Sequence, residues 1–105
     1  MCDIDLEIVF AHLKDEQIVT KDKLPVYERG QDIDMLCKDI HSVARKIILA
    51  GIALEYEMQV KKRMNQIHID FMNSNGLELR FDLYGSTEPW TRRTLWQKIK
   101  KRLPL

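Results

Sequence analysis

Two runs of alternating side chains around an Asn-Ser-Asn-Gly turn constrain the fold of this chain more than any other feature. Residues 67–72 and 77–84 alternate apolar and polar side chains, and the tetrapeptide 73–76 lies between them. Alternation with a period of two is typical of a strand that buries one face. Asn-Gly between two such runs is a strong hairpin signal. The sequence therefore predicts a β-hairpin here.

The register of this hairpin follows from the side-chain alternation. A two-residue Asn75-Gly76 loop would set apolar residues opposite polar ones and split the apolar face. A three-residue loop from Ser74 to Gly76, with Gly76 in the left-handed conformation, keeps the apolar side chains together. The predicted pairs are then Phe71–Leu79, Ile69–Phe81, Ile67–Leu83, Asp70–Arg80 and His68–Asp82.

Further strands are predicted upstream of the hairpin. Residues 32–37 and 54–61 both alternate as half-buried strands do, and the short run Ile18-Val19-Thr20 is β-prone. These segments and the hairpin together predict one mixed, mostly antiparallel sheet.

Three stretches have the spacing of amphipathic helices. They cover about residues 3–14, the segment after Asp39, and the segment from Ser86 onward. Asp39 is expected to cap the second helix and Gly51 to end it. The predicted fold is thus α+β in the order α-β-β-α-β-β-β-α, with helices covering one face of the sheet and the polar face left open.

Length and composition restrict the class of protein. A chain of 105 residues has the size of one domain, and 45 % hydrophobic with 31 % charged residues is ordinary for a globular protein. A net charge of +1 gives no bulk electrostatic attraction to nucleic acid or membrane. We find neither a signal-peptide pattern nor a run of ~20 apolar residues. We therefore expect a cytoplasmic protein.

The C-terminal segment differs in charge from the rest of the chain. We expect residues 1–86 to form the α/β domain and residues 87–105 to form a basic amphipathic helix packed on it. Between Glu88 and Leu105 there are six basic residues and one acidic residue. Such a segment is either a solvated helix face or a contact for nucleic acid or a partner protein.

Three strand-borne aspartates are the best candidates for chemistry. Asp32 and Asp34 project from the same face of one strand, roughly 6.6 Å apart along the chain. Asp82 lies on the polar face of the second hairpin strand, so all three aspartates are expected on the same face of the sheet. Converging carboxylates suit Mg²⁺, with Mn²⁺ as an alternative, because both ions take oxygen ligands. Every polar residue of a one-sided sheet shares this face, so a plain solvated surface remains the alternative.

Two neighbours of these aspartates admit two interpretations each. Asp70 could serve as the third ligand in place of Asp82, although a cross-strand ion pair with Arg80 also accounts for it. His68, predicted opposite Asp82, is either a functional residue, as a supporting group next to the ligands or as a base, or an ordinary exposed histidine.

The residues around these aspartates resemble the nucleotidyltransferase superfamily that includes DNA polymerase beta. Residues 30–36 read Gly-Gln-Asp-Ile-Asp-Met-Leu, and residues 79–84 read Leu-Arg-Phe-Asp-Leu-Tyr. They are similar to the family's glycine, its Asp-x-Asp strand and its third carboxylate on a later strand. Leu24-Pro25 and Glu28-Arg29-Gly30 match the small bacterial members, and the resemblance covers about residues 5–85.

The resemblance implies a fold, a reaction and a role for each aspartate. It implies a nucleotidyltransferase-like domain in which Asp32 and Asp34 bind both metal ions. Asp82 would be the third ligand and would help to activate the attacking hydroxyl. The reaction would be in-line attack on the α-phosphate of a nucleoside triphosphate by an unidentified acceptor, with release of pyrophosphate.

One part of the family pattern is missing, and its absence leaves alternatives open. The family usually carries Gly-Ser or Gly-Gly about ten residues before the first aspartate, and this sequence has Thr20-Lys21-Asp22 there. Either Gly30 and nearby cations hold the phosphates, or the domain is a non-catalytic, antitoxin-like module that binds a partner protein through its C-terminal helix. Nucleic-acid binding through the basic tail is a third possibility. The candidate phosphate-binding cations are Lys21, Arg29 and Lys38.

Overall fold

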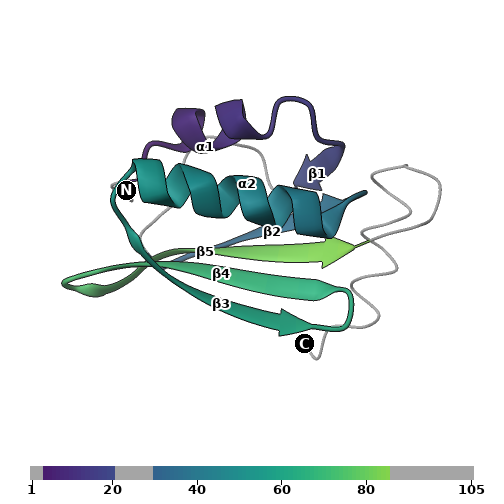
Figure 1. Ribbon diagram of the computed structural model, residues 1–105. Coiled ribbons are helices and arrows are strands. Elements are labelled where there is room, and N and C mark those ends of the chain that lie inside the picture. Colours follow the sequence, from purple (N-terminus) through teal and green to yellow (C-terminus); the bar gives the residue numbers. More distant parts are fainter. Residues whose placement is uncertain (1–3, 21–29, 86–105) are drawn as a thin grey trace.

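A computed structural model describes residues 4–20 and 30–85 of the chain (Figure 1). A sheet of five strands and two helices make up this part of the molecule. No helix among the described residues is long and apolar enough to cross a membrane. In chain order the elements are α1 (Leu6–His12), β1 (Ile18–Thr20), β2 (Asp32–Cys37), α2 (Ile40–Ala53), β3 (Glu57–Arg63), β4 (Gln66–Asn73) and β5 (Gly76–Gly85).

The sheet is mixed and mostly antiparallel, as predicted. Its strand order is β1-β2-β5-β4-β3. Among residues 4–20 and 30–85, only β2 and β5 pair in parallel, and the other three neighbouring pairs are antiparallel. Both helices lie on the same side of the sheet, with α2 across it and α1 beside α2 (Figure 1). The α+β prediction is therefore confirmed, while the predicted C-terminal helix and the domain division after residue 86 lie outside the described residues.

Polar side chains cap both helices at their first turn. The Asp5 carboxylate accepts hydrogen bonds from the Glu7 and Ile8 amides, and Asp39 accepts one from the Ser42 amide at 3.1 Å. These bonds satisfy amides that have no partner within the helix, so each aspartate fixes where its helix begins. The predicted Asp39 cap is confirmed.

The prediction that Gly51 ends α2 is wrong, because the helix continues to Ala53. Gly51 is buried in the last turn of α2, where a Cβ atom would meet Sδ of Met58 and lie 3.1 Å from Cζ of Phe71. The glycine therefore allows α2 to approach β3 and β4 closely.

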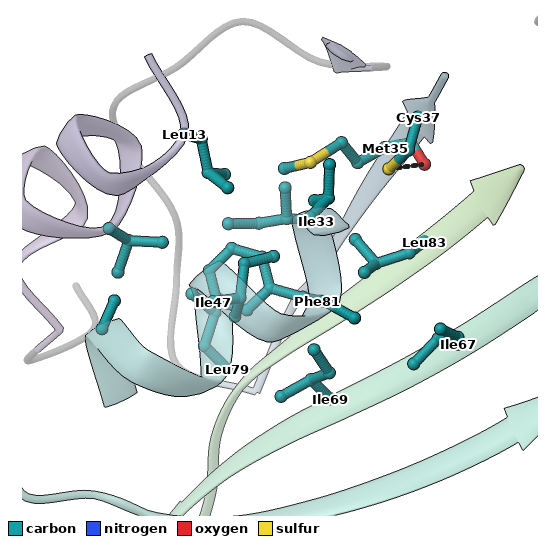
Figure 2. Packing of buried hydrophobic residues seen from close by; sticks show 14 of the residues in the cluster. Leu13, Ile33, Met35, Cys37, Ile47, Ile67, Ile69, Leu79, Phe81 and Leu83 are labelled. Carbon is teal, nitrogen blue, oxygen red and sulfur yellow. Dashed lines mark hydrogen bonds between the residues drawn. The ribbon is translucent and has the colours of Figure 1, made fainter. Parts of the chain in front are cut away.

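The core lies between α2 and the inward side chains of the sheet (Figure 2). Ile47 of α2 faces Ile33 of β2 and Phe81 of β5, and all three are fully buried. Leu13, which follows α1, joins the same cluster. Apolar burial of this extent is the main favourable contribution to folding. It places the core on one face of the sheet and the polar residues on the other.

The hairpin has the predicted register between residues 67–71 and 79–83, but its turn differs from the predicted one. The five predicted pairs between β4 and β5 are all present. Beyond Phe71–Leu79, however, the pairing shifts to Met72–Leu77 and Asn73–Gly76, which leaves a two-residue turn and makes Glu78 the extra residue of a β-bulge. Gly76 has a φ of +106°, the positive φ that was expected of it. The predicted three-residue loop is therefore replaced by a tighter turn and a bulge.

Strand β3 is the outer edge of the sheet and starts later than predicted. Its first residue is Glu57, because Glu55 has a positive φ of 63° and turns the chain after α2. Val60 pairs with Ile69 and shares its face, yet it is 40 % exposed. Most of β3 is exposed, so this strand contributes little to the core.

Candidate active site

Cross-strand pairing sets residues of four strands in three rows on the face opposite α2, and all of them are polar except the buried Leu36. Each row takes one residue from β3, β4, β5 and β2 in turn. Neighbouring strands lie roughly 4.8 Å apart, so residues next to each other in a row can touch. The rows are Lys61–His68–Asp82–Asp34, Gln59–Asp70–Arg80–Asp32 and Arg63–Gln66–Tyr84–Leu36.

The three predicted aspartates share this face and differ in burial. Asp34 and Asp82 are direct neighbours across the parallel strands β2 and β5, and Asp32 lies one row away on the strand of Asp34. Asp32 is exposed and Asp34 half-buried, whereas Asp82 is only 7 % exposed. The expectation that this face is open thus fails at Asp82.

Three side chains gather around the Asp82 carboxylate. His68 Nε2 lies 2.7 Å from Oδ1, Gln66 Nε2 donates to Oδ1 at 3.4 Å, and the Tyr84 hydroxyl donates to Oδ2 at 3.5 Å. The predicted pairing of His68 with Asp82 is therefore a direct contact. Gln66 and Tyr84 were not among the predicted site residues, although both alternate in step with His68 and Asp82, which is a signal that could have identified them.

Burial is the main influence on the pKa of the Asp82 carboxyl group. Loss of solvent raises the pKa of Asp82, and the charge of Asp32 raises it further, while His68, Gln66 and Arg80 oppose the shift. Burial and the nearby charge of Asp82 also raise the pKa of the Tyr84 phenol, which therefore stays protonated and able to donate. The site thus concentrates negative charge in a poorly solvated place.

Asp70 is held by the arginine that the register assigned to it. Arg80 Nε donates to Asp70 Oδ1 at 2.6 Å, and Arg80 Nη2 donates to Oδ2 at 3.0 Å. This bidentate geometry makes a strong ion pair. The hydrogen bonds to Asp70 also raise the pKa of Arg80. Both oxygens of Asp70 are engaged, so Asp82 remains our candidate for the third carboxylate.

Of the four predicted phosphate-binding residues, the structure describes Gly30, two residues before Asp32, and Lys38. Gly30 has a φ of +82°, and its amide donates to the Glu78 carbonyl at 2.9 Å, which ties it to the bulge of β5. Lys38 follows the end of β2, roughly 13 Å along the chain from Asp34, and lines a separate hollow with Asp39 and His41. Lys21 and Arg29 lie outside the described residues.

The carboxylates have the oxygen atoms that a divalent cation binds, but they are not arranged around a common point. Oxygen donors are what Mg²⁺ and Mn²⁺ prefer, and Asp34 and Asp82 are adjacent. Within residues 4–20 and 30–85, however, no three His, Cys, Asp or Glu side chains stand close enough together to hold a metal ion. Asp82 is instead in contact with His68.

Comparison with known proteins finds a likeness to solved structures but none to protein families or curated sequences. No protein-family model and no curated protein sequence matches the chain. Among solved structures, the chain is similar to one described as "Structural Basis for the Activity of a Cytoplasmic RNA Terminal U-transferase", with 15 % sequence identity and a TM-score of 0.46. The match covers 93 % of this chain and 31 % of that one, so the present chain spans about a third of its length.

Proposed function

We propose that this domain is a metal-dependent nucleotidyltransferase that transfers a nucleotide from a nucleoside triphosphate to an acceptor. The observation that carries the proposal is the in-register pairing of Asp34 with Asp82 on neighbouring strands, with Asp32 on the same face. The resemblance drawn from the sequence requires an Asp-x-Asp strand and a third carboxylate on a later strand. The sheet brings these two strands side by side.

In this proposal each carboxylate has a distinct task. Asp32 and Asp34 would hold the Mg²⁺ or Mn²⁺ ions, and Asp82 would share a metal ion and accept the proton of the acceptor hydroxyl. When bound, the metal ions would neutralise the triphosphate and stabilise charge on the attacking and leaving oxygens. His68 and Tyr84 would orient Asp82, because both contact its carboxylate.

A titration of Mg²⁺ and Mn²⁺ in the presence of each nucleoside triphosphate tests the proposal. Binding is read by thermal shift and calorimetry for the wild type, for Asp32→Asn/Asp34→Asn, and for Glu57→Gln as a matched control. Glu57 is an exposed carboxylate on the edge strand β3, outside the three rows of polar residues. We expect metal-dependent nucleotide binding that disappears in the double variant and persists in the control.

The same titration distinguishes a second function. Asp82 is engaged by His68, and the Gly-Ser or Gly-Gly pair that the family carries about ten residues before its first aspartate is missing here. These two observations favour a non-catalytic protein-binding module of the same fold. A folded wild type that binds no nucleotide with either metal would reject the enzyme and leave this module as the better account.

A further inference from the structure

The row that holds Asp34 and Asp82 ends in a lysine at the opposite edge of the sheet. Lys61 on β3 lies in that row, and Arg63, also on β3, ends the next row toward Tyr84. Both side chains are exposed, and no hydrogen bond or ion pair joins either to another residue that the structure describes. β3 is the outer strand in Figure 1, so these two cations form the rim of the polar face.

Charge on this face therefore changes sign across the sheet. Asp32, Asp34 and Asp82 make the β2–β5 side acidic, while Lys61 and Arg63 make one end of the β3 edge basic. Asp70 and Arg80 between them neutralise each other. A ligand that spans the face must accordingly bring negative charge to β3, while the part of it nearest the aspartates carries little charge or is accompanied by cations.

We propose that the acceptor is the end of a single-stranded nucleic acid whose phosphates contact Lys61 and Arg63. This inference rests on the proposed function and names its acceptor. Lys61 lies two strand spacings from Asp82, roughly 10 Å, so a phosphate at the β3 rim can belong to the same chain as a terminal hydroxyl at Asp82. In the neighbouring row, Tyr84 is half-buried and its hydroxyl donates to Asp82, so it lies beside the proposed position of the terminal nucleotide. A duplex end keeps its terminal bases paired and stacked, so a single strand fits better.

The test measures binding of a short 5′-fluorescein oligothymidine by anisotropy over a range of KCl concentrations. EDTA is present, so that the result does not depend on metal at the aspartates. Each phosphate contact on a single strand contributes roughly 0.7 to the slope of log affinity against log salt. We expect Lys61→Gln to lower that slope by roughly 0.7 and Lys61→Gln/Arg63→Gln to lower it by roughly 1.4.

Lys62 supplies the matched control, because it has the same charge on the same strand and faces the other way. It pairs with Ile67, whose side chain is in the core, and it is exposed. Lys62→Gln should keep the wild-type slope. Asp32→Asn/Asp34→Asn in EDTA should bind the oligonucleotide at least as tightly as the wild type, since it removes two negative charges.

Several results would overturn the proposal. These are a wild type that does not bind, a double β3 variant with an unchanged slope, an equal loss in Lys62→Gln, or equally tight binding of a blunt duplex. An unchanged slope would place any binding elsewhere, for example on the basic residues 92–102. Nucleotide binding is measured separately, so loss of the enzyme proposal and loss of this one give different patterns.

Discussion

At the scale of single residues, Asp82 is the group whose surroundings differ most from those of a surface carboxylate. It is 7 % exposed, in contact with His68, and one strand away from Asp34. Burying a carboxylate is unfavourable unless partners offset the lost hydration. Its partners here only partly do so, since the pKa of Asp82 remains above its ordinary value. A carboxylate whose pKa is shifted by burial and by a nearby charge is a candidate functional group.

This environment predicts that Asp82→Asn is more stable than the wild type at neutral pH. Because the pKa of Asp82 is higher in the folded chain than its ordinary 3.8, the folded chain holds the proton more tightly than the unfolded chain does. The contribution of Asp82 to stability is therefore greatest below pH 3.8 and declines as the pH rises through its folded pKa. The amide does not ionise and avoids this loss.

Urea unfolding of both proteins at several pH values between 4 and 7 measures the difference. The advantage of the asparagine variant in free energy of unfolding should grow with pH over this range, because the other titrating groups are common to both proteins. A difference that shrinks as the pH rises would show that the attraction of His68 outweighs the cost of burial. Far-UV circular dichroism checks that the variant keeps the fold.

Pairing at this site was predictable from the sequence, and burial was not. Alternation alone assigned His68 to Asp82 and Asp70 to Arg80, and both contacts are present. Burial of Asp82 depends in addition on how the Gln66 and Tyr84 side chains turn toward it. Alternation carries no information about that choice of rotamer. The role of Asp82 in catalysis stays a prediction.

At the scale of elements, the hairpin shows what parity can and cannot specify. With a two-residue turn alone, apolar residues of β4 would pair with polar residues of β5. One extra residue, either in the turn or within β5, brings the apolar residues of both strands onto the same face. The predicted three-residue loop contained this residue, whereas in the structure the extra residue is Glu78, which is fully buried in a bulge. The bulge brings the Glu78 carbonyl to the Gly30 amide, a long-range contact that local pattern does not reveal.

The end of α2 gives the element-scale prediction. Gly51→Ala should destabilise the protein by about 1 kcal/mol. Alanine favours a helix by roughly 1 kcal/mol over glycine, but overpacking a core costs roughly 1–3 kcal/mol. Here the new methyl would press on Met58 and on the fully buried Phe71. Urea unfolding measures the change in free energy of unfolding.

A double-mutant cycle with Met58→Ala separates the two effects. Shortening Met58 removes the closest contact of the new methyl, so Gly51→Ala should become stabilising in that background. If the substitution costs the same free energy with and without Met58, then the close approach of β3 to α2 is not what the glycine provides. The sequence pointed to a helix end at Gly51 because helical periodicity contains no information on what packs against the turn.

At the scale of the whole molecule, the sheet has a well-packed central strand, β5, and an exposed edge strand, β3. β5 pairs with β2 on one side and β4 on the other, and its inward residues Leu79, Phe81 and Leu83 are fully buried. Among the described strands, β3 pairs with β4 alone, and most of it is exposed. Asp34 and Asp82 stand on two adjacent strands of the inner part of the sheet, whereas the cations proposed to meet the acceptor stand on the edge. The proposed metal site is thus held more firmly than the proposed acceptor surface.

Hydrogen exchange followed by mass spectrometry should reveal this gradient. Peptides from β5 should exchange most slowly, because opening them requires breaking two ladders and exposing the core, while β3 and β1 should exchange fastest among the strands. Low urea concentrations should accelerate β3 first and leave β5 to exchange only with global unfolding. If β3 is protected as strongly as β5, the sheet opens as one unit. The β3 edge then has no more freedom to adapt to a ligand than the strands that carry the aspartates.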